Sequence, residues 1–173
     1  MDYVAFLRAI NVGGKNSIKM SDLRQIFQSI GLEKVTTYIQ SGNMLFSSKK
    51  SIESLANDIE DSISQSLGLS VPVIIRSIPE LESLLINNPL DDTIYKDLYF
   101  FMYSEELPEK DLLKINSIEN GCDKYIIAGA NIYAIFDKSI RESKLASTLQ
   151  KIGVRGTSRN KRTIEKIIEL SKL

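Results

Sequence analysis

Two segments of the chain carry the residue types that most often hold an anion. The first is "LRAINVGGKNSIKM" (7–20), in which Gly13, Gly14 and Lys15 follow a strand-like apolar stretch. The second is "GTSRNKRT" (156–163), in which three cations precede a helical pattern. Backbone amides exposed in glycine-rich turns and positively charged side chains are donors that bind phosphate and carboxylate groups. Both segments are therefore candidates for anion binding.

The glycine segment does not match a nucleotide-binding loop. A Walker-type loop needs the pattern G-x-x-x-x-G-K-[ST]. Gly14 and Lys15 match its second half, but Ala9 stands at the first glycine position and Asn16 at the hydroxyl position. The G-x-G-x-x-G spacing of dinucleotide-binding folds is missing as well. Two interpretations remain: an anion-binding loop, or glycines that only allow a tight strand-to-helix connection.

The candidate ligand-binding residues come from both segments. They are Asn11, Gly13, Gly14, Lys15, Lys19, Ser158, Arg159 and Asn160. Ser158 or Asn160 could cap the last helix. The dipole of this helix already makes its N-terminal end positive, and Arg159 and its basic neighbours add further positive charge there. Such a cluster predicts an anionic partner, which is either a ligand or the acidic middle of this chain. If the two segments fold together, they form one shared site.

Residues suited to acid-base or nucleophilic chemistry are scarce. The chain has no histidine, which excludes Ser-His and Cys-His pairs and removes the commonest ligand of transition metals. Cys122 is the single cysteine, and we interpret it as a small strand or loop residue. We therefore predict no catalytic residue, no metal ligand and no cofactor, and we favour a binding module over an enzyme.

The composition is that of a soluble globular protein, with 22 basic and 22 acidic residues. No apolar run approaches the ~18 residues of a membrane-spanning helix, and the N-terminus does not resemble a secretory signal. These features predict a cytoplasmic protein with no membrane partner. The net charge is +4 over residues 1–50, −11 over 51–137 and +7 over 138–173. If the two ends fold together, a basic face and an acidic face result.

Hydrophobic periodicity predicts the order β-α-β-β-α-β for the first half of the chain. The predicted strands are 2–8, 35–40, 43–47 and 71–77, and the helical stripes run over 23–30 and 52–67. Ser21 is a possible N-cap of the first helix, and Gly31 and Gly68 are expected to end the two helices. This order is that of the ferredoxin-like split βαβ unit, in which two helices cover one face of a four-stranded antiparallel sheet.

The same order recurs in the second half, after a short helix that starts at Pro79. The predicted segments are a strand over 97–103, a helix over 108–118, a hairpin over 123–136, a helical segment over 139–154, a last strand over 154–160 and an extra helix over 163–173. We therefore predict an α+β protein of two ferredoxin-like plaits. Its parts are a subdomain over 1–78, a helical linker over 79–96, and a second, divergent subdomain with the C-terminal helix over 97–173.

Three segments also carry a family resemblance. "VAFLRAINVGGKNSIKMSDLR", "TYIQSGNMLF" and "GTSRNKRTIEKIIEL" resemble the hallmark segments of a bacterial family of uncharacterised proteins, a domain of unknown function with LRGINVGG-like and TxRN-like motifs. The resemblance implies a pair of ferredoxin-like subdomains and no established activity. Ala9 stands where the family usually has glycine, and Lys161 where it usually has tryptophan.

Together these observations predict a non-catalytic cytoplasmic module that binds a small phosphate- or carboxylate-bearing ligand. The alternatives are a histidine-free enzyme of unknown reaction and a protein-protein interaction module. Nucleic acid is a less favoured partner, because the RNA-recognition signature K/R-G-F/Y-G/A-F-V-x-F/Y is missing and the strands read as apolar on both faces. The sequence leaves the oligomeric state open.

Overall fold

The computed structural model describes residues 1–14, 16–91, 97–119, 121–153 and 155–173. Contacts divide the chain into two compact units, which we call unit 1 (Met1–Glu82 with Ile167–Leu173) and unit 2 (Ser83–Lys166). Each unit holds one four-stranded antiparallel sheet and helices. The predicted mixed α+β class is therefore confirmed.

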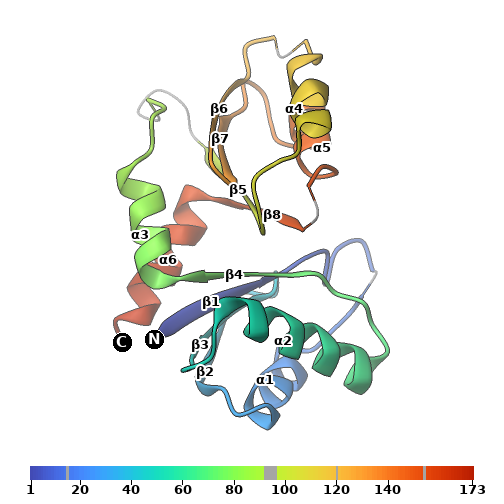
Figure 1. The fold of residues 1–173 in the computed structure, drawn as a ribbon, viewed down its shortest axis with the longest axis vertical. Helices are drawn as coiled ribbons and strands as arrows, with labels where there is room; N and C mark the ends of the chain where they lie inside the picture. Colours follow the sequence, from blue (N-terminus) through green and yellow to red (C-terminus); the bar gives the residue numbers. More distant parts are fainter. Residues whose placement is uncertain (15, 92–96, 120, 154) are drawn as a thin grey trace. The chain divides into compact units, whose positions relative to one another are not determined.

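Unit 1 contains the first sheet and the helices that cover one of its faces (Figure 1). Its elements are β1 (Asp2–Leu7), α1 (Met20–Ser29), β2 (Glu33–Tyr38), β3 (Asn43–Ser47), α2 (Ile52–Leu67), β4 (Val73–Ser77) and the start of α3 (Ile78–Ile86). The strand order is β2-β3-β1-β4, and all pairs are antiparallel. β1 is therefore a central strand. The loop that follows it begins at one end of the sheet, between the neighbouring strands β3 and β4.

Local signals explain where the helices of unit 1 begin and end. Ser51 caps α2 by accepting a hydrogen bond from the Ser54 amide, and Gly68 ends it in a left-handed conformation (φ +67°). The Ser21 cap predicted for α1 is wrong. Lys19 occupies the N-cap position there, without a side-chain cap, because α1 already begins at Met20.

The core of unit 1 lies between its sheet and helices α1 and α2. Ala5 and Leu7 of β1 point into it together with Phe27 of α1. The alternate residues Val4 and Phe6 are fully buried on the opposite face of the sheet. A strand that is buried on both faces reads as a continuous apolar run, which is why "YVAFL" shows no polar alternation.

Unit 2 repeats the element order of unit 1 (Figure 1). Its elements are β5 (Leu98–Tyr103), α4 (Glu109–Asn116), β6 (Lys124–Ala128), β7 (Asn131–Ile135), α5 (Lys144–Leu149), β8 (Gly156–Asn160) and the first part of α6 (Lys161–Ser171). The strand order, β6-β7-β5-β8, corresponds strand by strand to that of unit 1. The predicted recurrence of element order is therefore present in the fold.

In both units the last strand of the sheet runs directly into a helix. β4 leads directly into α3 and β8 directly into α6, with no loop between them. Ser77 and Asn160, the last strand residues, each accept a hydrogen bond from the amide three positions later (3.4 and 2.9 Å). Arg76 and Arg159 precede these caps, and each donates from Nη1 to the carbonyl of the residue before it (2.9 and 2.8 Å). The repeat thus extends to the helix after the last strand.

The structure differs from the predicted subdomain boundaries at the C-terminus. The division between Glu82 and Ser83 falls inside the predicted linker 79–96, but contacts assign Ile167–Leu173 to unit 1 rather than to the second subdomain. The physical reason is that Leu170 lines a groove together with strand residues of unit 1. Within the predicted helical segment 139–154, the described helix is only α5.

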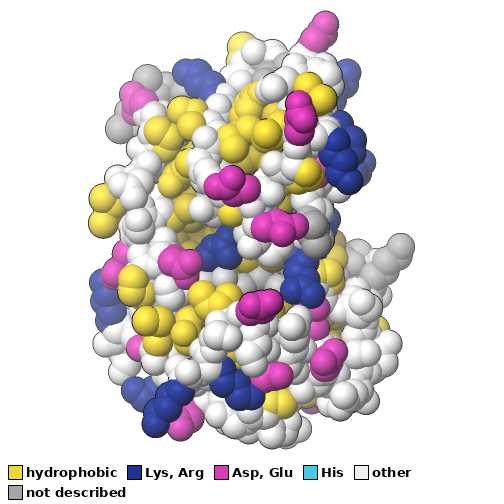
Figure 2. Space-filling view, viewed as in Figure 1, with side chains coloured by type: hydrophobic (Ala, Val, Ile, Leu, Met, Phe, Trp, Pro, Cys, Tyr) yellow, Lys and Arg dark blue, Asp and Glu magenta, His cyan; other side chains and the backbone are white. Residues whose placement is uncertain are grey.

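The uneven charge along the chain does not separate by unit. Unit 1 contains 9 basic and 10 acidic residues, and unit 2 contains 13 and 12, because the acidic helix α2 folds with the basic N-terminal segment. Figure 2 shows basic and acidic side chains interspersed over the visible face of each unit. None of the helices in the described part of the chain is long and apolar enough to cross a membrane.

Candidate functional site

The loop between β1 and α1 is held in shape by the side chain of Asn11. Its Nδ2 donates to the carbonyls of Ile18 and Gln40 (3.0 Å each), and its Oδ1 accepts from the Ile18 amide (2.8 Å). The Asn11 amide donates to the Asn16 carbonyl (3.1 Å), which closes the loop on itself. Asn11 was predicted to contact a ligand, but its side chain is occupied by these contacts and acts as a clamp on the backbone.

Left-handed backbone is concentrated in this loop. Ala9, Asn11 and Asn16 have φ values of 54°, 54° and 48°, and Gly13 and Gly14 have 59° and 74°. Glycine and asparagine adopt this region readily, whereas alanine costs roughly 1–2 kcal/mol there, so the strain in the loop lies mainly at Ala9. Strained backbone of this kind clusters at binding sites, where it preorganises donor groups.

The tip of the loop presents backbone amides to solvent. Val12, Gly13 and Gly14 are exposed, and among the described residues the Gly13 and Gly14 amides have no hydrogen-bond acceptor. Two successive residues with left-handed φ form a turn whose amides can converge on one anion. Lys19, also exposed, stands at the N-cap of α1, where the helix dipole is positive. Lys15, which was predicted to belong to this site, lies outside the described residues.

The β2–β3 hairpin packs against the glycine loop. A Cβ on Gly42 would lie 2.8 Å from Ile10 Cδ1 and 2.9 Å from Leu7 Cβ, so only glycine fits this contact. Asn43 is fully buried and donates to the Tyr38 carbonyl (3.1 Å). The segments "LRAINVGG" and "YIQSGN" therefore form one end of unit 1.

The second predicted segment lies at the edge of the unit 2 sheet. Arg159 is opposite Phe100 on the face away from α4 and α5, and its Nη1 donates to Thr157 Oγ1 and to the Ser158 carbonyl (2.8 Å each). Burial lowers the pKa of the Arg159 guanidinium to about 10. Asn160 caps α6, as predicted. The basic cluster is also engaged locally, since Lys161 lies 4.0 Å from the Glu165 carboxylate.

The predicted site residues thus fall into two groups. Asn11, Gly13, Gly14 and Lys19 belong to unit 1, and Ser158, Arg159 and Asn160 belong to unit 2. Within unit 1, the β1–α1 loop with Gly13 and Gly14 and the N-cap residue Lys19 lie at one end of the sheet. The shared site of both groups stays a prediction.

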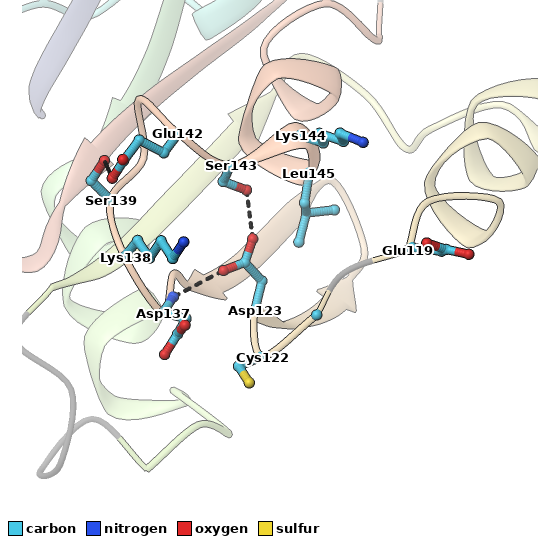
Figure 3. Close-up of a pocket in the computed structure, with 11 residues that line it drawn as sticks. Glu119, Cys122, Asp123, Asp137, Lys138, Ser139, Glu142, Ser143, Lys144 and Leu145 are labelled. Atoms are coloured by element: carbon cyan, nitrogen blue, oxygen red, sulfur yellow. Dashed lines mark hydrogen bonds between the residues drawn. The ribbon is translucent and has the colours of Figure 1, made fainter.

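A small cavity of about 220 Å³ lies in unit 2 beside the start of α5. The Asp123 carboxylate accepts hydrogen bonds from Ser143 Oγ (2.6 Å) and from the Asp137 amide (2.9 Å) (Figure 3). Ser143 Oγ also accepts from the Ala146 amide (3.0 Å) and so caps α5. These contacts join a loop to a helix, which is a structural role.

Cys122 lies at the rim of this cavity, in the turn before β6, and is an exposed free thiol. Figure 3 shows its sulfur pointing away from the Asp123–Ser143 pair. This placement agrees with the predicted loop role. Within the described residues, no cluster of three or more cysteines and carboxylates could hold a metal ion.

A larger groove of about 520 Å³ lies in unit 1, at the opposite end of β1 from the glycine loop. The lining residues are Asp2, Tyr3, Gln28, Lys34, Val35, Thr36, Leu45, Phe46, Ser47, Ile78, Leu170, Ser171 and Leu173. Sequence reasoning missed this groove. Its walls come from distant parts of the chain, and the strained conformation of Lys34 (φ 52°) leaves no mark in the sequence.

The chain matches a known protein family over most of its length. The family model "Protein of unknown function (DUF1697)" matches residues 1–133. The chain belongs to this family. The matched DUF1697 region contains the glycine loop, the β2–β3 hairpin and the strands that line the groove, whereas Ser158, Arg159 and Asn160 lie beyond it.

A solved structure resembles this DUF1697 chain over almost its full length. It is described as "The structure of conserved bacterial protein SP0830 from Streptococcus pneumoniae", and it is 28% identical with a TM-score of 0.79. The match covers 97% of each chain. No curated protein matches the chain.

Proposed function

We propose that this DUF1697 chain is a non-catalytic binding module whose β1–α1 loop holds the phosphate or carboxylate group of a small ligand. The observation that carries the proposal is the clamped loop, in which Gly13 and Gly14 are exposed and left-handed. Preorganised amides bind an anion without the entropic cost of ordering a flexible loop.

The positive charge near the loop supports the same proposal. Lys19 stands at the start of a helix of ten residues, where a cation is locally unfavourable. A bound anion would relieve this repulsion and form a charge-assisted hydrogen bond with the Lys19 ammonium. A cytoplasmic location belongs to the proposal, because small phosphorylated and carboxylated metabolites would be available there as ligands.

We also propose that each unit is a ferredoxin-like plait. The order β-α-β-β-α-β supports this assignment in both units, as does the antiparallel arrangement with the first and third strands in the centre. In unit 1, this topology brings the β1–α1 loop and the β2–β3 turn to the same end of the sheet. The plait thus explains why two family segments distant in sequence form one surface.

The test is a calorimetric titration of the full chain with inorganic phosphate and, separately, with acetate. Lys19→Ala should weaken phosphate binding about tenfold, the effect of losing one charge-assisted hydrogen bond. Lys49→Ala is the matched control, because Lys49 is equally exposed but lies at the other end of the sheet. Binding should also weaken when salt rises, since exposed charges are screened over ~10 Å at 0.1 M.

A glycine pair tests the backbone amides directly. Gly14→Ala and Gly31→Ala both place a methyl group in open space at a left-handed residue, so their strain is similar. Only Gly14→Ala would crowd the proposed anion. Equal phosphate affinity in these two variants, or affinity that Lys19→Ala leaves unchanged, would overturn the proposal.

A further inference from the structure

The groove of unit 1 has the size of a small-molecule site. Its volume of about 520 Å³ falls within the range of roughly 300–1,000 Å³ typical of ligand pockets. It lies between strands β1, β2 and β3 and the last residues of α6. Figure 1 shows the start of β1 and the end of α6 together at this side of unit 1.

The floor of the groove is apolar. Leu45 of β3 and Ile78 of α3 are almost fully buried, at 6% and 8% exposure, and Leu170 of α6 is half-buried. The apolar surface that a ligand can reach therefore belongs mainly to Leu170 and to Leu173, which is exposed. Covering that surface with an apolar group gains about 25 cal/mol per Å².

One side of the groove offers hydrogen-bond acceptors. Ser47 Oγ donates to the Asp2 carboxylate (2.5 Å), and Ser171 Oγ donates to the Ile168 carbonyl (2.7 Å). Both hydroxyl protons are therefore used inside the protein. The lone pairs of Ser47 and Ser171 and the second oxygen of Asp2 remain to accept, a set that suits an ammonium group.

The opposite side offers donors and is built on a strained residue. The β2–β3 register shifts between Glu33 and Thr36, and Lys34 in this bulge has φ 52°. Bulges redirect side chains next to functional sites, and a lysine in this conformation costs roughly 1–2 kcal/mol. Lys34 and Gln28 both line the groove, and their ammonium and amide groups are of the kind that can donate to a carboxylate.

The separation of the two polar sides sets the length of the ligand. Asp2 is paired with Ser47, and Ser47 is paired with Glu33, so the charges of Asp2 and Lys34 start from strands two spacings apart. That is about 10 Å between the two backbones. An extended dipeptide separates its terminal charges by roughly 7 Å, whereas the charges of a single amino acid are too close together.

We propose that the groove of unit 1 binds a short apolar peptide, with a dipeptide as the best-fitting length. The peptide ammonium binds on the Asp2–Ser47 side, the carboxylate binds Lys34, and the apolar side chains cover Leu170 and Leu173. This site is separate from the glycine loop, because Asp2 and Leu7 stand at opposite ends of β1. Either site can fail its test while the other stands.

The test uses Leu-Leu as the probe, in NMR and calorimetric titrations of the full chain. N-acetyl-Leu-Leu and Leu-Leu amide each remove one terminal charge from it. Free Leu-Leu should bind in the millimolar range or tighter, and each blocked peptide should bind about tenfold more weakly. Chemical-shift changes should map to β2, β3 and the end of α6.

A substitution at Lys34 separates carboxylate recognition from mere hydrophobic contact. Lys34→Met keeps most of the aliphatic stem and should weaken Leu-Leu to the level of Leu-Leu amide, while leaving the affinity of the amide unchanged. Lys49→Met, at another exposed lysine of unit 1, should change neither. Failure of Leu-Leu to bind at 10 mM would overturn the proposal. So would equal affinity of all three peptides, or unchanged Leu-Leu binding in Lys34→Met.

Discussion

The two units share one plan, but their first strand-to-helix connections differ. In unit 1, residues 8–19 link β1 to α1 through a loop with five left-handed residues and the Asn11 clamp. In unit 2, the corresponding link from β5 to α4 is only Ser104–Pro108. The core strands pair in the same way in both. The scaffold is therefore duplicated, whereas the strained loop is peculiar to unit 1.

The β2–β3 hairpin of unit 1 and the β6–β7 hairpin of unit 2 also differ. Gly42 in unit 1 is pressed against Ile10 and Leu7, whereas a Cβ on Gly129 in unit 2 would meet only Glu106 Oε1, at 3.8 Å. The edge strand β2 also carries a bulge at Lys34, while β6 pairs with β7 in regular register over its whole length. Among the described residues, left-handed backbone at residues other than glycine thus occurs only in unit 1, which is where both proposed binding sites lie.

The largest effect is expected when alanine replaces the two hairpin glycines. Gly42→Ala combines left-handed strain with overpacking and should lower the free energy of unfolding by about 2–4 kcal/mol. Gly129→Ala meets strain alone and should cost about 1 kcal/mol. Urea unfolding of both variants measures the difference, and equal losses would show that the hairpins are not distinct in packing.

Removal of the loop clamp should have the next largest effect. Asn11→Ala deletes three hydrogen bonds and should destabilise the protein by about 2–3 kcal/mol, at roughly 1 kcal/mol for each bond. If the clamp preorganises the glycine loop, phosphate affinity should fall as well. Thermal unfolding and calorimetry report the two quantities separately. A stability loss without any loss of binding would assign Asn11 to architecture alone.

Unit 2 contains a hydrogen bond between Gly153 and Asp111, and its contribution to stability should depend on pH. The Gly153 amide donates to Asp111 Oδ2 (3.0 Å), and this bond, with help from Lys114, lowers the pKa of the Asp111 carboxyl below 3.8. The ionised carboxylate therefore stabilises the folded protein at pH values above 3.8, the ordinary pKa of the group. This added stability is lost as the pH falls through the lower pKa of the folded state.

Asp111→Asn, which keeps the acceptor but removes the charge, should cost about 1 kcal/mol at pH 7. The difference from the wild type should shrink below about pH 4, the ordinary range of an aspartate pKa. Unfolding curves between pH 2 and pH 7 measure it. A difference that does not change with pH would contradict the role of the charge.

A smaller gain is expected at Ala9. Its φ of 54° and its exposed side chain mean that glycine relieves strain without opening a cavity. Ala9→Gly should stabilise the protein by about 0.5–1 kcal/mol, because the relief of left-handed strain exceeds the extra chain entropy of glycine. A higher melting temperature is the expected observation, and a lower one would show that the loop needs the methyl group.

The smallest effect is expected at Cys122. Its thiol is exposed and has no structural role in the cavity of unit 2. Cys122→Ser should change the unfolding free energy by less than about 0.5 kcal/mol, the usual range for surface substitutions. It should also leave phosphate binding unchanged. Loss of binding after rapid labelling of the native thiol would point instead to a functional cysteine.

Most of the fold could be predicted because its signals are local. Apolar periodicity located the strands and longer helices, and Gly68 ends α2 as its residue type suggests. The equivalence of α3 and α6 escaped prediction, because each follows its strand without a loop or a turn residue to mark the change. The start of α1 was misplaced for a related reason, since Lys19 is not a usual capping residue.

The candidate sites could be predicted only where sequence neighbours form them. The glycine loop is one continuous segment, so Gly13, Gly14 and Lys19 stood out. The function of Asn11 did not, because its partners include Gln40, far along the chain. The groove was missed altogether, since Asp2, Lys34 and Leu170 meet only through tertiary packing.

Helix α6 gives the chain an unusual order of completion. Its residues up to Lys166 belong to unit 2, and Ile167–Leu173 belong to unit 1. A ribosome makes the rest of unit 1 first, then all of unit 2, and only then the segment with Leu170 that lines the groove. During synthesis the groove floor therefore stays incomplete until unit 2 has emerged. The N-terminal unit, translated first, is the last to reach its finished form.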